Sequence, residues 1–163
     1  MTTETHATSE NDRKEIEIRN ILVPIDGSEY SLHAAQYATR IARNEQVQLF
    51  CIHIVTPRMP YGYATSAASS AKGRNYDDIK NKVESWFDIV RNRAKDEGIF
   101  DIKTEIFIDV KSIIESIIEY ATRKNINLIV IGTRGVPLLR RFFMGSVANG
   151  VVQHAHCSVL VIR

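Results

Sequence analysis

Cysteine, long apolar runs and an excess of one charge are all scarce in this sequence, and each scarcity excludes a class of protein. Two cysteines among 163 residues do not make a disulfide framework. No apolar run approaches the ~20 residues that cross a bilayer, and residues 1–15 lack the apolar segment of a signal peptide. The net charge of +2 is too small to indicate a basic surface that binds nucleic acid or an anionic membrane. We expect a cytoplasmic protein whose partners include neither nucleic acid nor membrane.

Recognisable catalytic and metal-binding patterns are missing as well. No G-x4-G-K-[S/T] loop occurs, and no catalytic triad can be assembled from the sequence. His154, His156 and Cys157 lie close together but lack a fourth metal ligand at a recognisable spacing. We therefore predict neither catalytic residues nor metal-binding side chains. His53, on an apolar strand, is expected to be a hydrogen-bonded core residue.

The composition and the order of apolar segments predict one α/β domain. Residues 1–15 are polar and are predicted to form a disordered tail, and residues 16–163 form the domain. Apolar runs alternate with segments of helical period, which is typical of βαβ units. The predicted strands span residues 20–25, 48–55, 103–108, 128–131 and 159–162, and the predicted helices span 29–44, 76–97, 111–124 and 146–153. If the strand order is the common doubly wound one, with strands 1 and 4 adjacent, we expect a Rossmann-like, open five-stranded parallel sheet in the order 3-2-1-4-5, with helices on both faces.

Local signals refine this expectation at several points. Ser28 is a plausible N-cap for the first helix, and Gly98 is expected to end the second. Trp86 lies on the apolar stripe of the second helix, so we interpret it as a core residue. Residues 56–75 are rich in proline, glycine, serine and alanine, and we interpret them as one long loop. Because structureless loops of more than ~15 residues are uncommon, this loop is mobile, ordered by a ligand or partner, or partly helical, and we favour mobility.

A glycine motif follows the fourth predicted strand and precedes the fourth predicted helix. Gly132, Gly135 and Gly145 have the spacing G-x2-G-x9-G, and Ser146 follows the third glycine. Glycines let backbone N–H groups approach phosphate oxygens, and free amides at a helix start favour an anion. Each glycine alone has a structural explanation, such as a strand end, a turn or a close approach. All three together, between a buried strand and a helix, favour a phosphate cradle.

These residues resemble the universal stress protein family over residues 16–163. The run Ile21-Leu22-Val23-Pro24-Ile25-Asp26-Gly27-Ser28 is similar to the family's first strand and its turn, and His53-Ile54 to the end of its second strand. The motif G-x2-G-x9-G-S is similar to the signature of the family's ATP-binding branch. The resemblance implies an adenine nucleotide alpha hydrolase-like fold and ATP as the ligand.

The resemblance also implies a set of residues that bind ATP, with Mg2+ bridging its phosphates. Pro24, Asp26 and Gly27 would flank the adenosine, Ile54 would contact the adenine, Ile131 and Gly132 would line the ribose, and Arg134, Gly135, Gly145, Ser146 and Val147 would hold the phosphates. The sequence departs from the family pattern at Ser158, where proline is common, and in the bulky stretch 140–144. Neither departure touches the motif.

The family resemblance further implies a homodimer that pairs through the last strand, residues 158–162. Our leading hypothesis is an ATP-binding regulator of the stress response that acts on an unknown partner protein. Two alternatives remain open: a nucleotide-free interaction module of the same fold, and a binder of AMP or a cyclic nucleotide. The turn after the first strand lacks the double glycine of ATP pyrophosphatases, so we expect at most a slow ATPase and no true enzyme.

Overall fold

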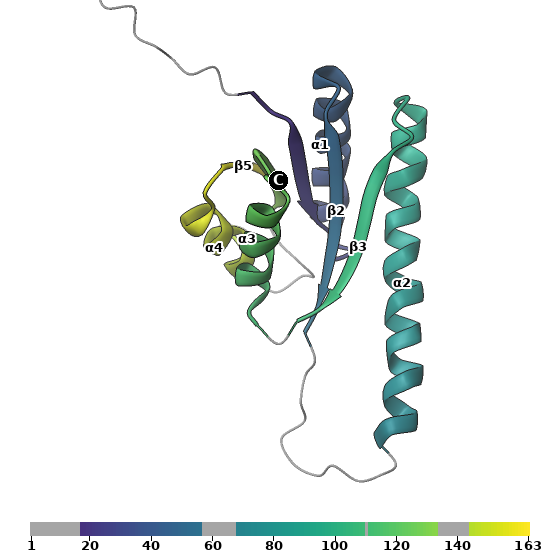
Figure 1. The fold of residues 1–163 in the computed structure, drawn as a ribbon. Helices are drawn as coiled ribbons and strands as arrows, with labels where there is room; N and C mark the ends of the chain where they lie inside the picture. Colours follow the sequence, from purple (N-terminus) through teal and green to yellow (C-terminus); the bar gives the residue numbers. More distant parts are fainter. Residues whose placement is uncertain (1–16, 57–67, 110, 134–143) are drawn as a thin grey trace, which may run out of the picture.

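Five parallel strands form one sheet in the order β3-β2-β1-β4-β5, as predicted. The computed structural model describes residues 17–56, 68–109, 111–133 and 144–163, without the side chains of 68–75. The strands are β1 (Asn20–Pro24), β2 (Gln48–Val55), β3 (Ile102–Ile108), β4 (Leu128–Gly132) and β5 (Ser158–Ile162), and the helices are α1 (Glu29–Glu45), α2 (Ala68–Asp96), α3 (Ile113–Arg123) and α4 (Ser146–His154) (Figure 1).

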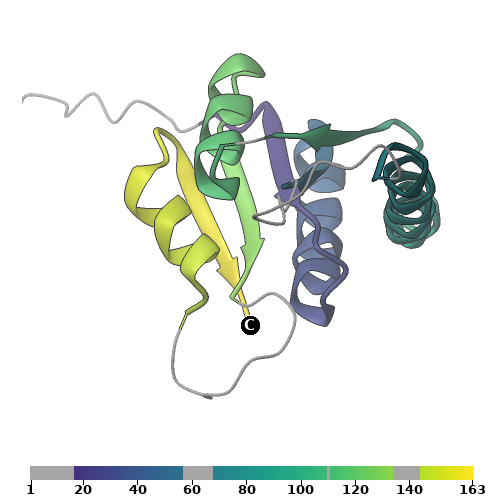
Figure 2. The ribbon, with the colours of Figure 1, turned by 90° about the horizontal axis from the view of Figure 1, so that it is seen from below.

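The sheet is covered on both faces, and each face has its own hydrophobic core. Helices α1 and α2 pack on one face around residues such as Val23, Ala38 and Phe87. Helices α3 and α4 pack on the other face around residues such as Leu22, Ile117 and Val151 (Figure 2). Burial on both faces explains why the central strands are continuous apolar runs rather than alternating ones.

Helix α2 is longer than the sequence suggested, because it begins at Ala68 and extends over 29 residues. The prediction of one loop over 56–75 is therefore wrong for its second half. Residues 68–72 read Ala-Ser-Ser-Ala-Lys, and because alanine has the highest helix propensity, this segment extends the helix at little cost. Residues 57–67 of the predicted loop and the predicted tail at 1–15 lie outside the described residues.

The predicted helix boundaries at Ser28 and Gly98 are confirmed. The Ser28 hydroxyl accepts a hydrogen bond from the Ser31 backbone N–H at 3.1 Å, so α1 begins directly after the turn that follows β1. Gly98 has φ +83°, a left-handed conformation that glycine adopts without strain. Across the described ranges, no helix combines the length and the apolar character needed to cross a membrane.

Candidate functional site

The carboxyl ends of β1 and β4 lie side by side at the point where the strand order reverses. The two strands pair in parallel, with Ile21 opposite Leu128 and Leu22 opposite Ile129. The chain leaves β1 toward β2 on one side and β4 toward β5 on the other. In an open parallel sheet this switch point is where ligands bind, because the two loops that follow the strands diverge there.

The loop after β1 is a tight turn that holds Asp26 at the sheet edge. Gly27 has φ +77°, so the turn depends on a left-handed residue. The Ser28 N–H donates to Asp26 Oδ1 at 3.0 Å, and the Asp26 N–H donates to Ser31 Oγ at 3.4 Å. Asp26 is only partly buried. The turn therefore presents a carboxylate whose orientation is set by the first turn of α1.

The two ends of the glycine motif meet beside β4. The Gly145 N–H donates to the Thr133 carbonyl oxygen at 2.7 Å, and the Thr133 N–H donates to the Ile162 carbonyl oxygen at 2.7 Å. These bonds fix the start of α4 against the end of β4, although residues 134–143 separate them in the chain. Arg134 and Gly135 lie outside the described residues.

Helix α4 differs from α1 and α3 at its N-terminus. Ser28 caps α1 and Ser112 caps α3 through their side chains, and each of these helices has a glutamate in its first turn. Gly145 caps α4 without a side-chain hydrogen bond, and the first turn of α4 contains no acidic residue. The first N–H groups of a helix have no partner within the helix and attract anions. Of these three helix starts, α4 is the one suited to a phosphate.

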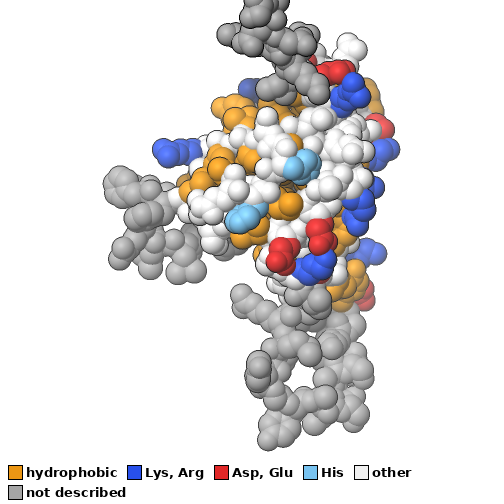
Figure 3. All heavy atoms as spheres, turned by 60° about the vertical axis from the view of Figure 1, so that its left-hand side comes forward, with side chains coloured by type: hydrophobic (Ala, Val, Ile, Leu, Met, Phe, Trp, Pro, Cys, Tyr) orange, Lys and Arg blue, Asp and Glu red, His pale blue; other side chains and the backbone are white. Residues whose placement is uncertain are grey.

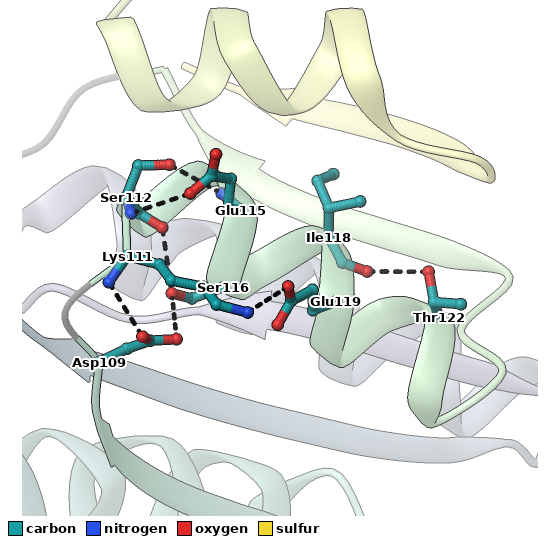
Figure 4. Close-up of polar contacts among 8 residues, drawn as sticks. All are labelled: Asp109, Lys111, Ser112, Glu115, Ser116, Ile118, Glu119 and Thr122. Atoms are coloured by element: carbon teal, nitrogen blue, oxygen red, sulfur yellow. Dashed lines mark hydrogen bonds and ion pairs between the residues drawn. The ribbon is translucent and has the colours of Figure 1, made fainter.

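The start of α3 is closed by its own residues, although it lies at the same sheet edge as the other strand ends (Figure 4). The Glu115 N–H donates to Ser112 Oγ at 3.2 Å, and the Ser112 N–H donates to Glu115 Oε2 at 3.3 Å. Asp109 accepts hydrogen bonds from Ser116 Oγ at 2.9 Å and from the Lys111 N–H at 3.0 Å. This capping box and the Asp109 carboxylate leave the α3 start unsuited to an external anion.

The apolar residues predicted to line the site lie at the ends of three strands. Ile54 and Ile131 are buried in the same hydrophobic cluster, and Pro24 is partly buried at the end of β1. A Cβ atom on Gly132 would lie 2.6 Å from the Tyr30 carbonyl carbon. Gly132 therefore allows α1 to approach β4 closely, which is one of the structural explanations raised for the motif glycines.

The described residues that were predicted to hold the phosphates lie at or near the surface. Ser146 is exposed, and Gly145 and Val147 are partly buried at the start of α4. A ligand at this helix start is thus accessible from solvent. Gly145, Ser146 and Val147 lie at the same sheet edge as Asp26 and Gly27. Asp26 and Gly27 follow the carboxyl end of β1, and the hydrogen bond of Gly145 to the residue after β4 holds the start of α4 beside the carboxyl end of that strand.

Two residues next to the site were not identified from the sequence. Tyr30 contacts Gly132, and Trp86 of α2 contacts Gly27. Trp86 packs against the core that α1 and α2 cover, as predicted, but it also reaches the turn after β1. Both contacts join residues far apart in the sequence, and no local pattern marks them. The predicted hydrogen bond of His53 is confirmed, since its Nδ1 lies 2.6 Å from the Ile25 carbonyl oxygen.

Comparisons with known proteins agree on one family. The model of the universal stress protein family matches residues 17–163. The universal stress protein MJ0531 of Methanocaldococcus jannaschii is 32% identical over 145 residues, which cover 89% of this chain and 82% of that protein. The solved UspA of Lactobacillus plantarum is 29% identical with a TM-score of 0.77, covering 90% of this chain and 99% of that one.

Two further solved structures share the fold at lower identity. The universal stress protein of Archaeoglobus fulgidus, solved with dAMP, is 20% identical with a TM-score of 0.60, covering 91% of this chain and 99% of that one. A universal stress protein solved with cAMP is also 20% identical, with a TM-score of 0.66, and the match covers 90% of this chain and 98% of that one.

Proposed function

The chain belongs to the universal stress protein family, and we propose that it binds ATP where β1 and β4 end and acts as a nucleotide-dependent regulatory dimer in the stress response. The observation that carries this proposal is the start of α4. Its cap has no side-chain hydrogen bond, its first turn has no acidic residue, and the Gly145–Thr133 hydrogen bond places it beside β4. An anionic group there gains both the backbone donors and the helix dipole.

The proposed nucleotide lies across the switch point between the two loops. The turn at Asp26 and Gly27 would flank the adenosine, and Gly145, Ser146 and Val147 would hold the phosphates together with Arg134 and Gly135. No group of three or more histidine, cysteine or acidic side chains suited to a metal occurs in the described ranges. Mg2+ commonly binds through one carboxylate, phosphate oxygens and water, so Asp26 and the triphosphate are a sufficient set. When bound, this ion neutralises phosphate charge.

An adenine nucleotide other than ATP is the second candidate. Two proteins of this fold were solved with dAMP and with cAMP, and both ligands carry adenine and a single phosphate. The same adenosine pocket would accept AMP or a cyclic nucleotide if only part of the α4 start were used. The nucleotide-free interaction module is the third candidate. We propose a binding role in the cytoplasm without catalysis beyond slow ATP hydrolysis.

Calorimetric titration separates these candidates. ATP, AMP and cyclic AMP are each titrated into the protein with and without Mg2+. Tight ATP binding that weakens without Mg2+ supports the proposal, whereas equal affinity for ATP and AMP favours the monophosphate reading. No binding of any of the three supports the nucleotide-free module.

We propose that the homodimer pairs through β5. The two edge strands of the sheet differ in charge: β3 carries Lys103 and Glu105, whereas residues 144–162 contain no lysine, arginine, aspartate or glutamate. An uncharged strand edge is prone to pair with another strand. The side of the molecule that carries α4 and β5 shows hydrophobic side chains at its surface, and most charged groups lie around the edges of this face (Figure 3).

The register of β5 indicates which residues would pair across this dimer. Because the Ile162 carbonyl oxygen accepts from Thr133, the polar backbone groups of Ile162 point toward β4, and those of Val161 and Val159 point outward. Val159→Pro removes an outward N–H and should yield monomers in sedimentation equilibrium. Val159→Ala is the matched control, since it keeps the N–H and should stay dimeric. A dimeric proline variant would contradict pairing through β5.

A further inference from the structure

The turn after β1 is supported on its outer side by Trp86, the protein's one tryptophan. A Cβ atom on Gly27 would lie 2.2 Å from Trp86 Cε2 and 2.3 Å from Cζ2. The indole ring of α2 therefore occupies the space directly against the Cα atom of Gly27. Trp86 is partly buried and packs against the core between the sheet and helices α1 and α2. The residue thus contacts the candidate site and the core at once.

His53 joins this support to the end of β1. Its Nδ1 lies 2.6 Å from the Ile25 carbonyl oxygen, which only accepts, so Nδ1 carries the proton and donates. The His53 and Trp86 rings meet edge to face, with centroids 5.4 Å apart and an interplanar angle of 72°. His53 holds Ile25 and Trp86 holds Gly27, so the two residues that flank Asp26 are held by one pair of contacting rings.

Lys82 completes the arrangement from one turn earlier in α2. Its Nζ lies 5.6 Å from the centroid of the Trp86 ring, within the range of a cation–π contact. The inner side of the turn is held by the first turn of α1 through Ser28 and Ser31. The Asp26–Gly27 peptide thus lies between α1 and the Trp86 ring, and a displacement of either one moves it.

We propose that Trp86 is a positioning residue of the nucleotide site, which sets the place of Gly27 and of the Asp26 carboxylate and couples this turn to α2. The proposal rests on the proposed function at the β1 and β4 ends. The ring lies 18 residues after the start of α2, and the N-terminal part of this helix extends past the sheet (Figure 1). A nucleotide that moves the turn therefore also moves Trp86 and, with it, the N-terminal part of α2 that extends past the sheet.

The contact itself is tested without nucleotide by a double-mutant cycle on unfolding. Gly27→Ala introduces a clash with the ring, and Trp86→Ala removes the ring. If the ring fills the space at Gly27, the double variant is more stable than the sum of the single effects predicts. Additive effects would overturn the contact. Lys82→Ala is the control, because it removes the cation and leaves the ring against Gly27.

The positioning role is tested by titrating ATP, AMP and cyclic AMP while following Trp86 fluorescence and, in parallel, heat of binding. We expect the emission to change with the same Kd as the heat. Trp86→Phe should keep the affinity within about threefold, and Trp86→Ala should lose about tenfold or more, because displacement of a binding group costs affinity. Lys80→Ala, at an exposed position of the same helix, should bind as wild type does.

The outcomes separate the two proposals. If wild-type protein releases no heat with any of the three nucleotides, the proposed function fails, and the positioning role fails with it. If wild type binds nucleotide but its emission is constant and Trp86→Ala binds equally well, the proposed function stands and the positioning role is overturned. Loss of affinity in Trp86→Ala together with rescue by Trp86→Phe supports the role when circular dichroism shows that both variants are fully folded under the titration conditions, since Trp86→Ala also leaves a cavity in the core.

Discussion

Replacement of Gly132 by alanine should destabilise the protein by forcing α1 away from β4. The added Cβ atom would lie 2.6 Å from the Tyr30 carbonyl carbon and 2.8 Å from its oxygen. A displacement of about 0.8 Å restores a contact of 3.4 Å, and backbone atoms in the first turn of α1 must supply it. Overpacking of this kind costs about 1–3 kcal/mol. For a chain of this length the thermal midpoint should fall by about 2–12 °C.

Gly150→Ala is the matched control, since it adds the same atom at another buried glycine. Its Cβ would lie 2.4 Å from Cδ1 of Ile114, which is the flexible end of a side chain and can turn away. Alanine also favours the interior of α4 by about 1 kcal/mol over glycine, which offsets the repacking. We therefore expect a free energy of unfolding close to that of wild type.

Urea unfolding followed by circular dichroism measures both variants. A Gly132→Ala variant as stable as wild type, or a Gly150→Ala variant that loses more stability than Gly132→Ala, would contradict the expected backbone clash between Gly132 and Tyr30. Because Tyr30 and Gly132 also flank the switch point, Gly132→Ala should weaken nucleotide binding, whereas Gly150→Ala should leave it unchanged.

Three further predictions concern the phosphate loop, the α3 cap and the thiols. Gly135→Val combined with Gly145→Val should abolish ATP binding in calorimetry and leave a folded dimer, because side chains would fill the phosphate cradle; undiminished affinity would contradict the site. Ser112→Ala should cost about 1 kcal/mol in urea unfolding through loss of the capping box, and Ser112→Asp should restore most of it; equal stability of all three would contradict the cap. Burial raises the pKa of the Cys51 thiol to about 12, so a thiol reagent should label native protein only at Cys157 and unfolded protein at both cysteines. The free energy of unfolding should fall as the pH rises above about 9, because only the unfolded Cys51 thiol ionises there. Early labelling of Cys51 in native protein would contradict its burial.

The strands were predictable because their signals are local, whereas their order was expected from the common doubly wound arrangement of such sheets. Residues 21–23 and 128–131 are continuous apolar runs, which in a parallel sheet mean burial on both faces. Ser28 and Gly98 marked helix ends for equally local reasons, through a capping hydroxyl and a left-handed glycine. The early start of α2 was missed, because proline, glycine and serine in the preceding stretch outweighed the alanines near residue 68.

The contacts that shape the candidate site were beyond the reach of local patterns. Gly27 and Trp86 are separated by all of α1, all of β2 and much of α2, and neither periodicity nor spacing connects them. The same holds for Tyr30 and Gly132, which pair a helix start with a distant strand end. Sequence patterns predicted which loops meet at the sheet edge. Which residue packs against Gly27 and which packs against Gly132 depends on the tertiary structure.

Analysis of the small molecules released from freshly purified protein shows whether this chain carries an adenine nucleotide, which we place at the ends of β1 and β4. The protein is denatured, and the released small molecules are identified by absorbance and mass spectrometry, followed by reloading with ATP and Mg2+. We expect ATP or another adenine nucleotide in the released fraction, or saturable reloading at micromolar ATP. Protein that releases no nucleotide and cannot be loaded with ATP, AMP or cyclic AMP would contradict it.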